Sequence, residues 1–188
     1  MKHELERLHA RRLKLEEGEQ GFTLIELLVV LLIIGILLAI AIPTFLSVTK
    51  TANNTAAQAN LQTALTGADT FYTSNSQTFT GLLGGVGVST ITAIDTGLSY
   101  TGTATSKSNT IALKYSGSAG YVLLLAWSPG TKDCWAILDQ KAVQGAAVFG
   151  NTSLATGTYY NVMKQPAACS TATFSVAGAW PTTGFPTG

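Results

Sequence analysis

The sequence has few of the side chains that enzymes use for catalysis. Only 11% of its 188 residues are charged, and its two histidines, His3 and His9, both precede residue 22. A serine or cysteine nucleophile needs a base within reach, and that base is most often histidine. No phosphate-binding glycine loop accompanies this shortage. The sequence therefore predicts a protein that is not an enzyme and that uses no cofactor.

Metal and nucleic-acid sites are equally poorly supported. Cys134 and Cys169 are the only cysteines, and two thiols without a nearby histidine are half of a zinc ligand set. After residue 21 the basic residues are six scattered lysines, which form no stripe that a nucleic acid would bind. We therefore expect no metal site and no specific nucleic-acid site.

What the sequence does have is one long apolar segment near its start. Residues 27–42 read LLVVLLIIGILLAIAI, and counting from Phe22 the segment is long enough for a helix to cross a bilayer, which takes about 20 residues. Five Lys or Arg residues precede it, and only Lys50 follows closely. The positive-inside rule then places the first residues in the cytoplasm and most of the chain outside the membrane.

One carboxylate, Glu26, stands at the beginning of this segment. An unpaired charge deep in a bilayer costs on the order of 3 kcal/mol or more, so an ionisable residue there is read as functional by default. The segment itself offers no opposite charge, and we expect Glu26 to find its partner elsewhere.

The residues Gly21-Phe22-Thr23-Leu24-Ile25-Glu26, followed by the apolar run and Ala41-Ile42-Pro43, resemble the class III signal of type IV prepilins and pseudopilins. The resemblance implies that a membrane peptidase cuts between Gly21 and Phe22 and methylates the new amino group of Phe22. It also implies that Glu26 pairs with the Phe22 amine of a neighbouring subunit during assembly. Gly35 and Pro43 stand where pilins carry helix-weakening residues, which implies local melting in a fibre.

Two other kinds of apolar segment are alternatives to a class III signal. A secretory signal peptide has a shorter apolar stretch, about 7–15 residues, with its cleavage site after it. A generic single-pass anchor fits the hydropathy but explains neither Glu26 nor the Gly21-Phe22 pair. The leader of 21 residues and Gln20 before the glycine leave the subfamily open.

The organisation expected from these patterns has four parts. Residues 1–21 are a cleaved leader, 22–46 the transmembrane and fibre-core half of a long helix, 47–75 its amphipathic soluble half, and 76–188 an extracytoplasmic β-rich domain. An apolar stripe supports the second helical half. It consists of Leu61, Ala64, Leu65, Ala68 and Tyr72. The fold class is α+β, a long helix packed on a small antiparallel sheet, as in pilins.

Strands are predicted at 88–94, 110–115, 121–128, 134–139 and 173–176. The turn signal Ser128-Pro129-Gly130-Thr131 predicts a hairpin between the third and fourth of these. Trp127, Trp135, Trp180 and Tyr121 are interpreted as core residues rather than as a ligand patch. We expect Asp133 and Asp139 to share a strand face and to be solvated.

Cys134 and Cys169 are expected to form a disulfide, because paired cysteines in an extracytoplasmic domain usually do. Closing a loop of about 36 residues stabilises a fold by roughly 3–4 kcal/mol.

The function predicted from the sequence is that of a structural subunit of a type IV pilus-like filament for adhesion, motility or surface contact. By resemblance, its partners are other pilin subunits, a prepilin peptidase and methyltransferase, an assembly ATPase and a membrane platform protein. It is located in the cell membrane before assembly and in an extracellular filament afterwards. The alternatives are a pseudopilin of a type II secretion or DNA-uptake machine, and a membrane-anchored surface binding module.

Overall fold

A computed structural model describes residues 21–84, 90–118, 120–142, 154–164, 166, 168–174 and 180–186. Its dominant element is helix α2, Leu24–Ser74, which continues through Pro43. The chain divides into two compact units, Met1–Leu46 and Ser47–Gly188. The boundary between them lies inside α2, so one helix serves both units.

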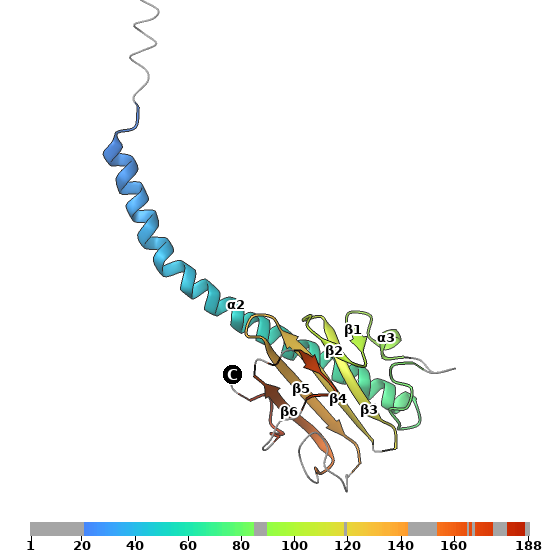
Figure 1. Cartoon of the computed structure of the whole chain (residues 1–188). Coiled ribbons are helices and arrows are strands. Elements are labelled where there is room, and N and C mark those ends of the chain that lie inside the picture. The colour runs from blue at the N-terminus through green and yellow to red at the C-terminus, as the bar shows by residue number, and fades with distance from the viewer. Residues whose placement is uncertain are drawn as a thin grey trace, which may run out of the picture. The chain divides into compact units, whose positions relative to one another are not determined.

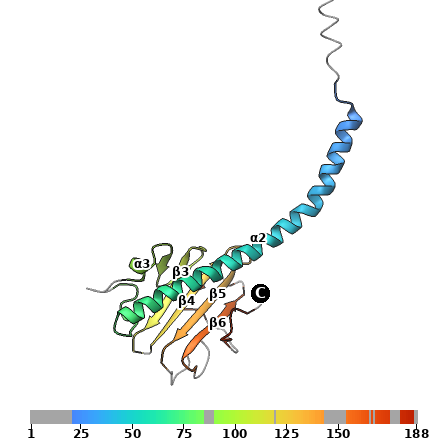
Figure 2. The same cartoon turned by 180° about the vertical axis from the view of Figure 1, so that it is seen from behind.

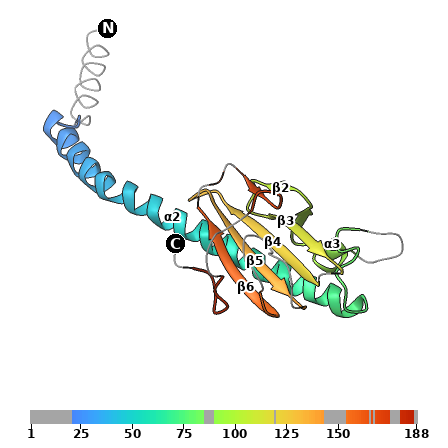
Figure 3. The same cartoon turned by 60° about the horizontal axis from the view of Figure 1, so that its bottom comes forward.

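The second unit is built on a five-stranded sheet with the order β1-β3-β4-β5-β6. Its strands are β1 Ser99–Thr101, β3 Thr110–Ser116, β4 Tyr121–Ser128, β5 Asp133–Gln140 and β6 Gly157–Met163. All neighbours pair antiparallel except β1 and β3, which are parallel. Two short strands, β2 Ala104–Thr105 and β7 Cys169–Ser170, form a separate antiparallel pair (Figure 3).

The second half of α2, from Ser47 to Ser74, lies across one face of this sheet, as Figures 1 and 2 show from opposite sides. Small and aromatic side chains bring the helix close to the strands: Ala57, Leu61, Ala64, Gly67, Ala68 and Phe71 are all buried. Leu65 and Tyr72 are partly buried against the same core. The apolar stripe predicted on the helix is therefore confirmed as its sheet-facing side.

The opposite face of the sheet carries a second apolar core. It is formed by Leu123, Leu125, Trp127 and Leu138 together with Leu154, Tyr159, Phe174 and Trp180 from the last part of the chain. Because both faces are covered, β5 is buried at all eight positions and β4 at seven. A strand covered on both sides reads as a continuous apolar run rather than an alternating one. That explains the sequence LLLAW in β4.

The predicted α+β fold is confirmed, a long apolar helix packed on a small and mostly antiparallel sheet, and it is pilin-like. The hairpin between β4 and β5 is also confirmed, with Ser128 opposite Asp133 at its turn. The three tryptophans are core residues as predicted, with Trp135 under the helix and Trp127 and Trp180 on the other face. Tyr121 packs partly buried against that second core.

Two strand predictions are wrong over the residues that the structure describes. Residues 91–94, within the strand predicted at 88–94, form the single helical turn α3, Ile91–Ile94, which buries Ile91 in the helix-side core. Thr173 and Phe174, within 173–176, lie in a turn and in irregular chain. Short apolar runs of this kind cannot be assigned from periodicity alone, because helix and strand both accept them. Thr90 is extended and precedes α3 as its N-cap residue. Residues 88, 89, 175 and 176 lie outside the described part of the chain.

Candidate functional site

The predicted cleavage point, Gly21-Phe22, lies in irregular backbone just before the first turn of α2. Phe22 is 88% exposed. A Cβ atom built on Gly21 would meet no described atom within 4 Å. The peptide bond between these residues is therefore exposed and is not packed against any described part of the chain.

Glu26 lies on the first turn of α2 and forms a capping box with Thr23. Its Oε2 atom accepts hydrogen bonds from the backbone N–H and the hydroxyl of Thr23, both at 2.8 Å. The Glu26 N–H in turn points to the Thr23 hydroxyl at 3.3 Å. These reciprocal bonds satisfy amide groups that a helix start leaves unpaired. The pattern Thr-x-x-Glu before an apolar run is the sequence signal of such a box, and our sequence analysis missed it.

This geometry corrects one expectation. We expected the Glu26 carboxylate to find no partner within its own segment, but Thr23 supplies two donors. Hydrogen bonds from neutral groups orient and partly solvate a carboxylate without cancelling its charge. The position of the Glu26 charge is thus fixed at the start of the helix, and no described residue supplies it with a cationic partner.

The half of α2 that follows Glu26 has no buried residue as far as Leu46. By length and composition the helix is long and apolar enough to cross a membrane, and the apolar part is not buried inside the molecule. An exposed apolar surface of this size marks a membrane or protein contact. The segment is therefore a surface that needs a partner, either lipid or other helices.

Gly35 and Pro43, the predicted helix-weakening residues, both lie within this exposed half. A Cβ atom on Gly35 would meet nothing within 4 Å, so packing inside the chain does not require glycine there. Pro43 has no N–H to donate to the carbonyl four residues earlier, yet α2 is unbroken. The Thr44 hydroxyl bonds the carbonyls of Ile40 and Ala41 at 2.7 and 3.0 Å. Melting of this segment in a fibre stays a prediction.

In the second unit a disulfide joins Cys134 and Cys169, whose Cα atoms are 5.2 Å apart. It connects β5 in the main sheet to β7 in the two-stranded pair. Both cysteines are fully buried in the core opposite the helix. The bond thus fixes the late part of the chain onto the sheet.

Asp133 and Asp139 share the helix-facing side of β5, as expected, but they are not solvated. Their side chains are only 4% and 3% exposed, and each is paired with a lysine. Lys164 lies 3.3 Å from Asp133. Buried carboxylates are tolerated only when paired and hydrogen-bonded, and both partners come from other parts of the fold. The expectation of solvated aspartates is therefore wrong.

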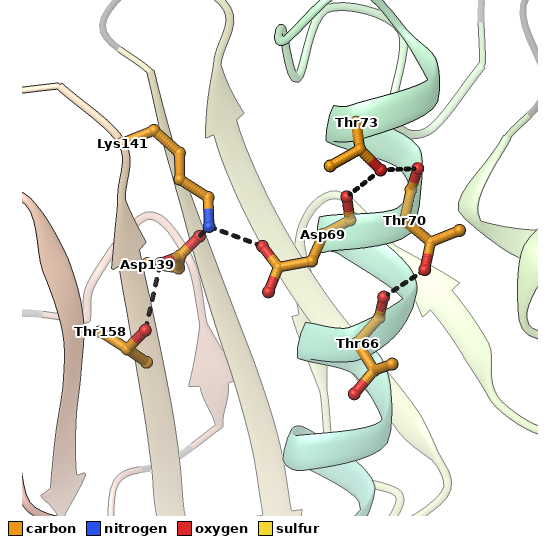
Figure 4. Close-up of polar contacts among 7 residues, drawn as sticks. All are labelled: Thr66, Asp69, Thr70, Thr73, Asp139, Lys141 and Thr158. Carbon is orange, nitrogen blue, oxygen red and sulfur yellow. Dashed lines mark hydrogen bonds and ion pairs between the residues drawn. The ribbon is translucent and has the colours of Figure 1, made fainter.

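Lys141 lies between two carboxylates, Asp69 of α2 at 2.7 Å and Asp139 of β5 at 2.9 Å (Figure 4). The Thr158 hydroxyl donates to the second oxygen of Asp139 at 3.2 Å. Burial raises the pKa of Asp139, and the neighbouring ammonium opposes this only in part. Burial disfavours the charged form of Lys141, but the two carboxylates outweigh it and raise the pKa of Lys141. This triad connects the far end of the helix to the sheet.

No group of three or more His, Cys, Asp or Glu side chains in the described ranges could hold a metal ion.

Comparison with known families gives one match. Residues 18–42 match the model of the prokaryotic N-terminal methylation motif. No curated protein and no solved structure matches the chain. The matched segment contains the exposed Gly21-Phe22 bond, the Glu26 capping box and most of the unburied apolar helix. The chain therefore carries the class III signal of type IV pilins and pseudopilins on a pilin-like fold.

Proposed function

We propose that this protein is the precursor of a filament subunit, cut after Gly21 and polymerised through the first half of helix α2. The observation that carries the proposal is the combination of an accessible Gly21-Phe22 bond, a fixed Glu26 charge and an apolar helix that buries nothing in its own chain. A surface of this kind is costly in water and has to be covered. In the membrane lipid covers it, and in a filament the same helices of other subunits would do so.

Cleavage between Gly21 and Phe22 would create the cation that the Glu26 carboxylate lacks. The new amino group of Phe22 would carry a positive charge near the start of the helix, close to the level of the Glu26 carboxylate along the helix axis. Pairing it with Glu26 of a neighbouring subunit neutralises both charges in an apolar environment, where an unpaired charge is most expensive. The Thr23 hydrogen bonds hold the carboxylate at the helix start, where an incoming amine can reach it. Assembly would then be favoured over the isolated membrane-bound chain.

The role that fits these features is structural rather than enzymatic. The partners we propose are other copies of the subunit, a prepilin peptidase that also methylates Phe22, and an assembly ATPase acting through a platform protein. The β-rich unit would wait outside the membrane and be displayed on the finished filament, for adhesion, motility or surface contact. A pseudopilin of a secretion or DNA-uptake machine would share the same N-terminal features.

The test combines N-terminal sequencing and intact mass of material sheared from cells with electron microscopy of the sheared fraction. The wild-type chain is expected to begin at N-methylated Phe22 and to sediment as filaments. Glu26→Gln keeps the side-chain size and an acceptor for Thr23 but removes the charge. We expect it to insert and to be cut, yet to yield no filaments.

Asp95→Asn is the matched control, since it removes one carboxylate from the second unit and should leave filaments unchanged. Wild-type filament yield from Glu26→Gln would overturn the assembly role of the charge. A mature wild-type chain found only in membranes would favour a pseudopilin. A chain that is never cut in cells with an active peptidase would leave only the anchored binding module.

A further inference from the structure

A groove of about 520 Å³ runs along the first turns of α2 in the second unit. It is bounded by the helix on one side and by the β4–β5 turn, Trp135 and the final described residues on the other. Its lining residues include Lys50, Asn54, Gln58, Thr131, Trp135 and Phe185. The groove is not part of the assembly site described above, and its lining mixes polar and aromatic side chains.

Hydrogen-bond donors with no described partner line this groove from the helix side. Lys50, Asn54 and Gln58 are spaced at i, i+4 and i+8, which places them on one face of a helix. The Asn54 oxygen accepts from the Thr131 hydroxyl at 2.8 Å and from the Trp135 indole N–H at 3.4 Å. These bonds orient the Asn54 amide and leave its NH2 group for a ligand. Ammonium and amide donors in a row suit an anionic, oxygen-rich group.

The other wall is aromatic. The Phe185 ring meets the Trp135 ring edge-on, with centroids 5.6 Å apart, and meets Tyr160 at 4.9 Å. Trp135 is almost fully buried, so its indole N–H and ring edge form the floor rather than a mobile flap. Aromatic side chains beside polar ones are typical of a membrane–water interface, where one end of the ring is apolar and the other wet.

Positive charge gathers at the same end of the unit. The β4–β5 turn packs directly on the helix, since a Cβ on Gly130 would come within 3.0 Å of the Lys50 Cα atom. Lys132 belongs to this turn, and the Lys164 ammonium lies 5.7 Å from the centre of the Trp135 ring. Asp133 is paired with Lys164. The acids Asp69 and Asp139 lie toward the other end of the helix, around Lys141.

Chain connectivity places this end next to the membrane. Ser47, the first groove residue, directly follows Leu46, the last residue of the first unit. At 1.5 Å per residue, Lys50 lies about 6 Å beyond Leu46 along the helix. The headgroup region of a bilayer is of that thickness, roughly 5–7 Å on each side of the hydrocarbon core. With the apolar segment across the bilayer, a lysine this close in the chain to Leu46 would be within reach of lipid phosphates, and Asn54 and Gln58 would follow further out.

From this arrangement we propose that the groove binds the headgroup of an anionic phospholipid in the outer leaflet of the membrane. Lys50 contacts the phosphate, and the Asn54 and Gln58 amides bond the polar end of the headgroup. The bound lipid holds the second unit at the membrane surface until assembly. The inference rests on the membrane-bound stage of the proposed function and is independent of cleavage and of filament formation.

The test uses the purified full-length chain in a neutral detergent, with phosphatidylglycerol or phosphatidylcholine added and retained lipid counted by native mass spectrometry. We expect the chain to retain phosphatidylglycerol in preference to phosphatidylcholine. Lys50→Gln should weaken phosphatidylglycerol retention about five-fold, the usual contribution of one lysine at an anionic surface. Lys50→Arg should preserve it, because the charge stays in place.

Lys107→Gln is the matched control, an equal loss of charge on an exposed loop about 15 Å further along the helix direction, next to Asn60. Retention that falls equally in Lys107→Gln and Lys50→Gln would mean attraction by net charge alone and would overturn the proposal. Displacement of the lipid by inorganic phosphate at matched concentration would also overturn it, because the site would then bind free phosphate. Equal retention of the two lipids would do the same. Since the assay needs neither peptidase nor filaments, failure of the proposed function would be seen separately.

Discussion

From Leu24 to Leu46, helix α2 buries none of its side chains, whereas from Ser47 to Ser74 it buries six against the sheet. The two halves share one continuous backbone and differ in their surroundings. The first half is apolar on every side, and all of its residues are exposed. The second half is apolar on one face only, and that face packs against the sheet. Helix formation thus depends on the local sequence, whereas the role of each half of the helix depends on which surface packs against it.

The charges follow the same division. In the first half the Glu26 carboxylate accepts two hydrogen bonds from Thr23 and has no other partner among the described residues. In the second half the Asp69 carboxylate is paired with Lys141, which also holds Asp139. A charge satisfied within the fold stabilises one chain, whereas a charge left for another chain favours association. Substitutions in the two halves should therefore have different effects, and the largest is expected in the second half.

The largest effect is expected from removing a buried aromatic ring of the second half. Phe71 is 1% exposed in the core under the sheet, whereas Phe45 in the first half is 71% exposed. Phe71→Ala should lower the free energy of unfolding by about 3–5 kcal/mol, as usual for a large-to-small change in a core. Phe45→Ala should change it by less than about 0.5 kcal/mol. Urea unfolding of both variants in detergent, followed by tryptophan fluorescence, measures the difference. Equal losses would contradict the division of the helix.

A smaller loss is expected when the cation between the two carboxylates is removed. Lys141→Gln leaves the Asp139 charge buried with only Thr158 as a partner, which should cost on the order of 1–3 kcal/mol. Asp69 is 44% exposed and adds little, because water screens its charge. Urea unfolding near neutral pH measures this loss. Asn60→Ala, which removes a contact of the same helix to Ser108, is a control without buried charge.

The pH dependence of the same triad has a definite sign. The pKa of Lys141 is raised above its ordinary value of 10.5 in the folded chain. Its stabilising contribution is therefore complete below that value and is lost as the pH rises through the folded pKa. Wild-type stability should fall above about pH 10.5 more steeply than that of Lys141→Gln. Parallel curves would show that Lys141 does not stabilise the charged carboxylates.

The smallest effect concerns the start of the first half. Thr23→Val keeps the side-chain shape but removes the hydroxyl that caps the helix and binds Glu26. We expect a loss of about 1 kcal/mol in the stability of the first turn, typical of a lost N-cap. Hydrogen exchange of the amides of residues 24–26 in micelles should become several-fold faster. Urea unfolding of the second unit should stay unchanged, and a change there would mean that the halves are energetically coupled.

Much of this arrangement could be predicted from short-range patterns. A continuous apolar run, a glycine and phenylalanine before a carboxylate, and a Pro-Gly turn are each contained in a few neighbouring residues. They predicted the helix over its whole length, the apolar stripe and the central hairpin. Strand β6, Gly157–Met163, was missed although Gly157 precedes a run of Thr, Tyr and Val, residues typical of strands. The strands β1, β2 and β7 have only two or three residues and carry no periodic signal.

Local sequence patterns therefore indicate which part of the chain is long and apolar enough to span a membrane, where its helix begins and where the N-terminal methylation motif lies. These depend on local propensity and on hydrophobic length. Only the tertiary structure decided that Asp133 and Asp139 are buried and paired, that residues 91–94 form a helical turn, and that Lys50, Asn54 and Trp135 line one groove. Those outcomes depend on contacts between residues up to about a hundred positions apart, whose side chains come together only when the sheet forms and packs against the helix.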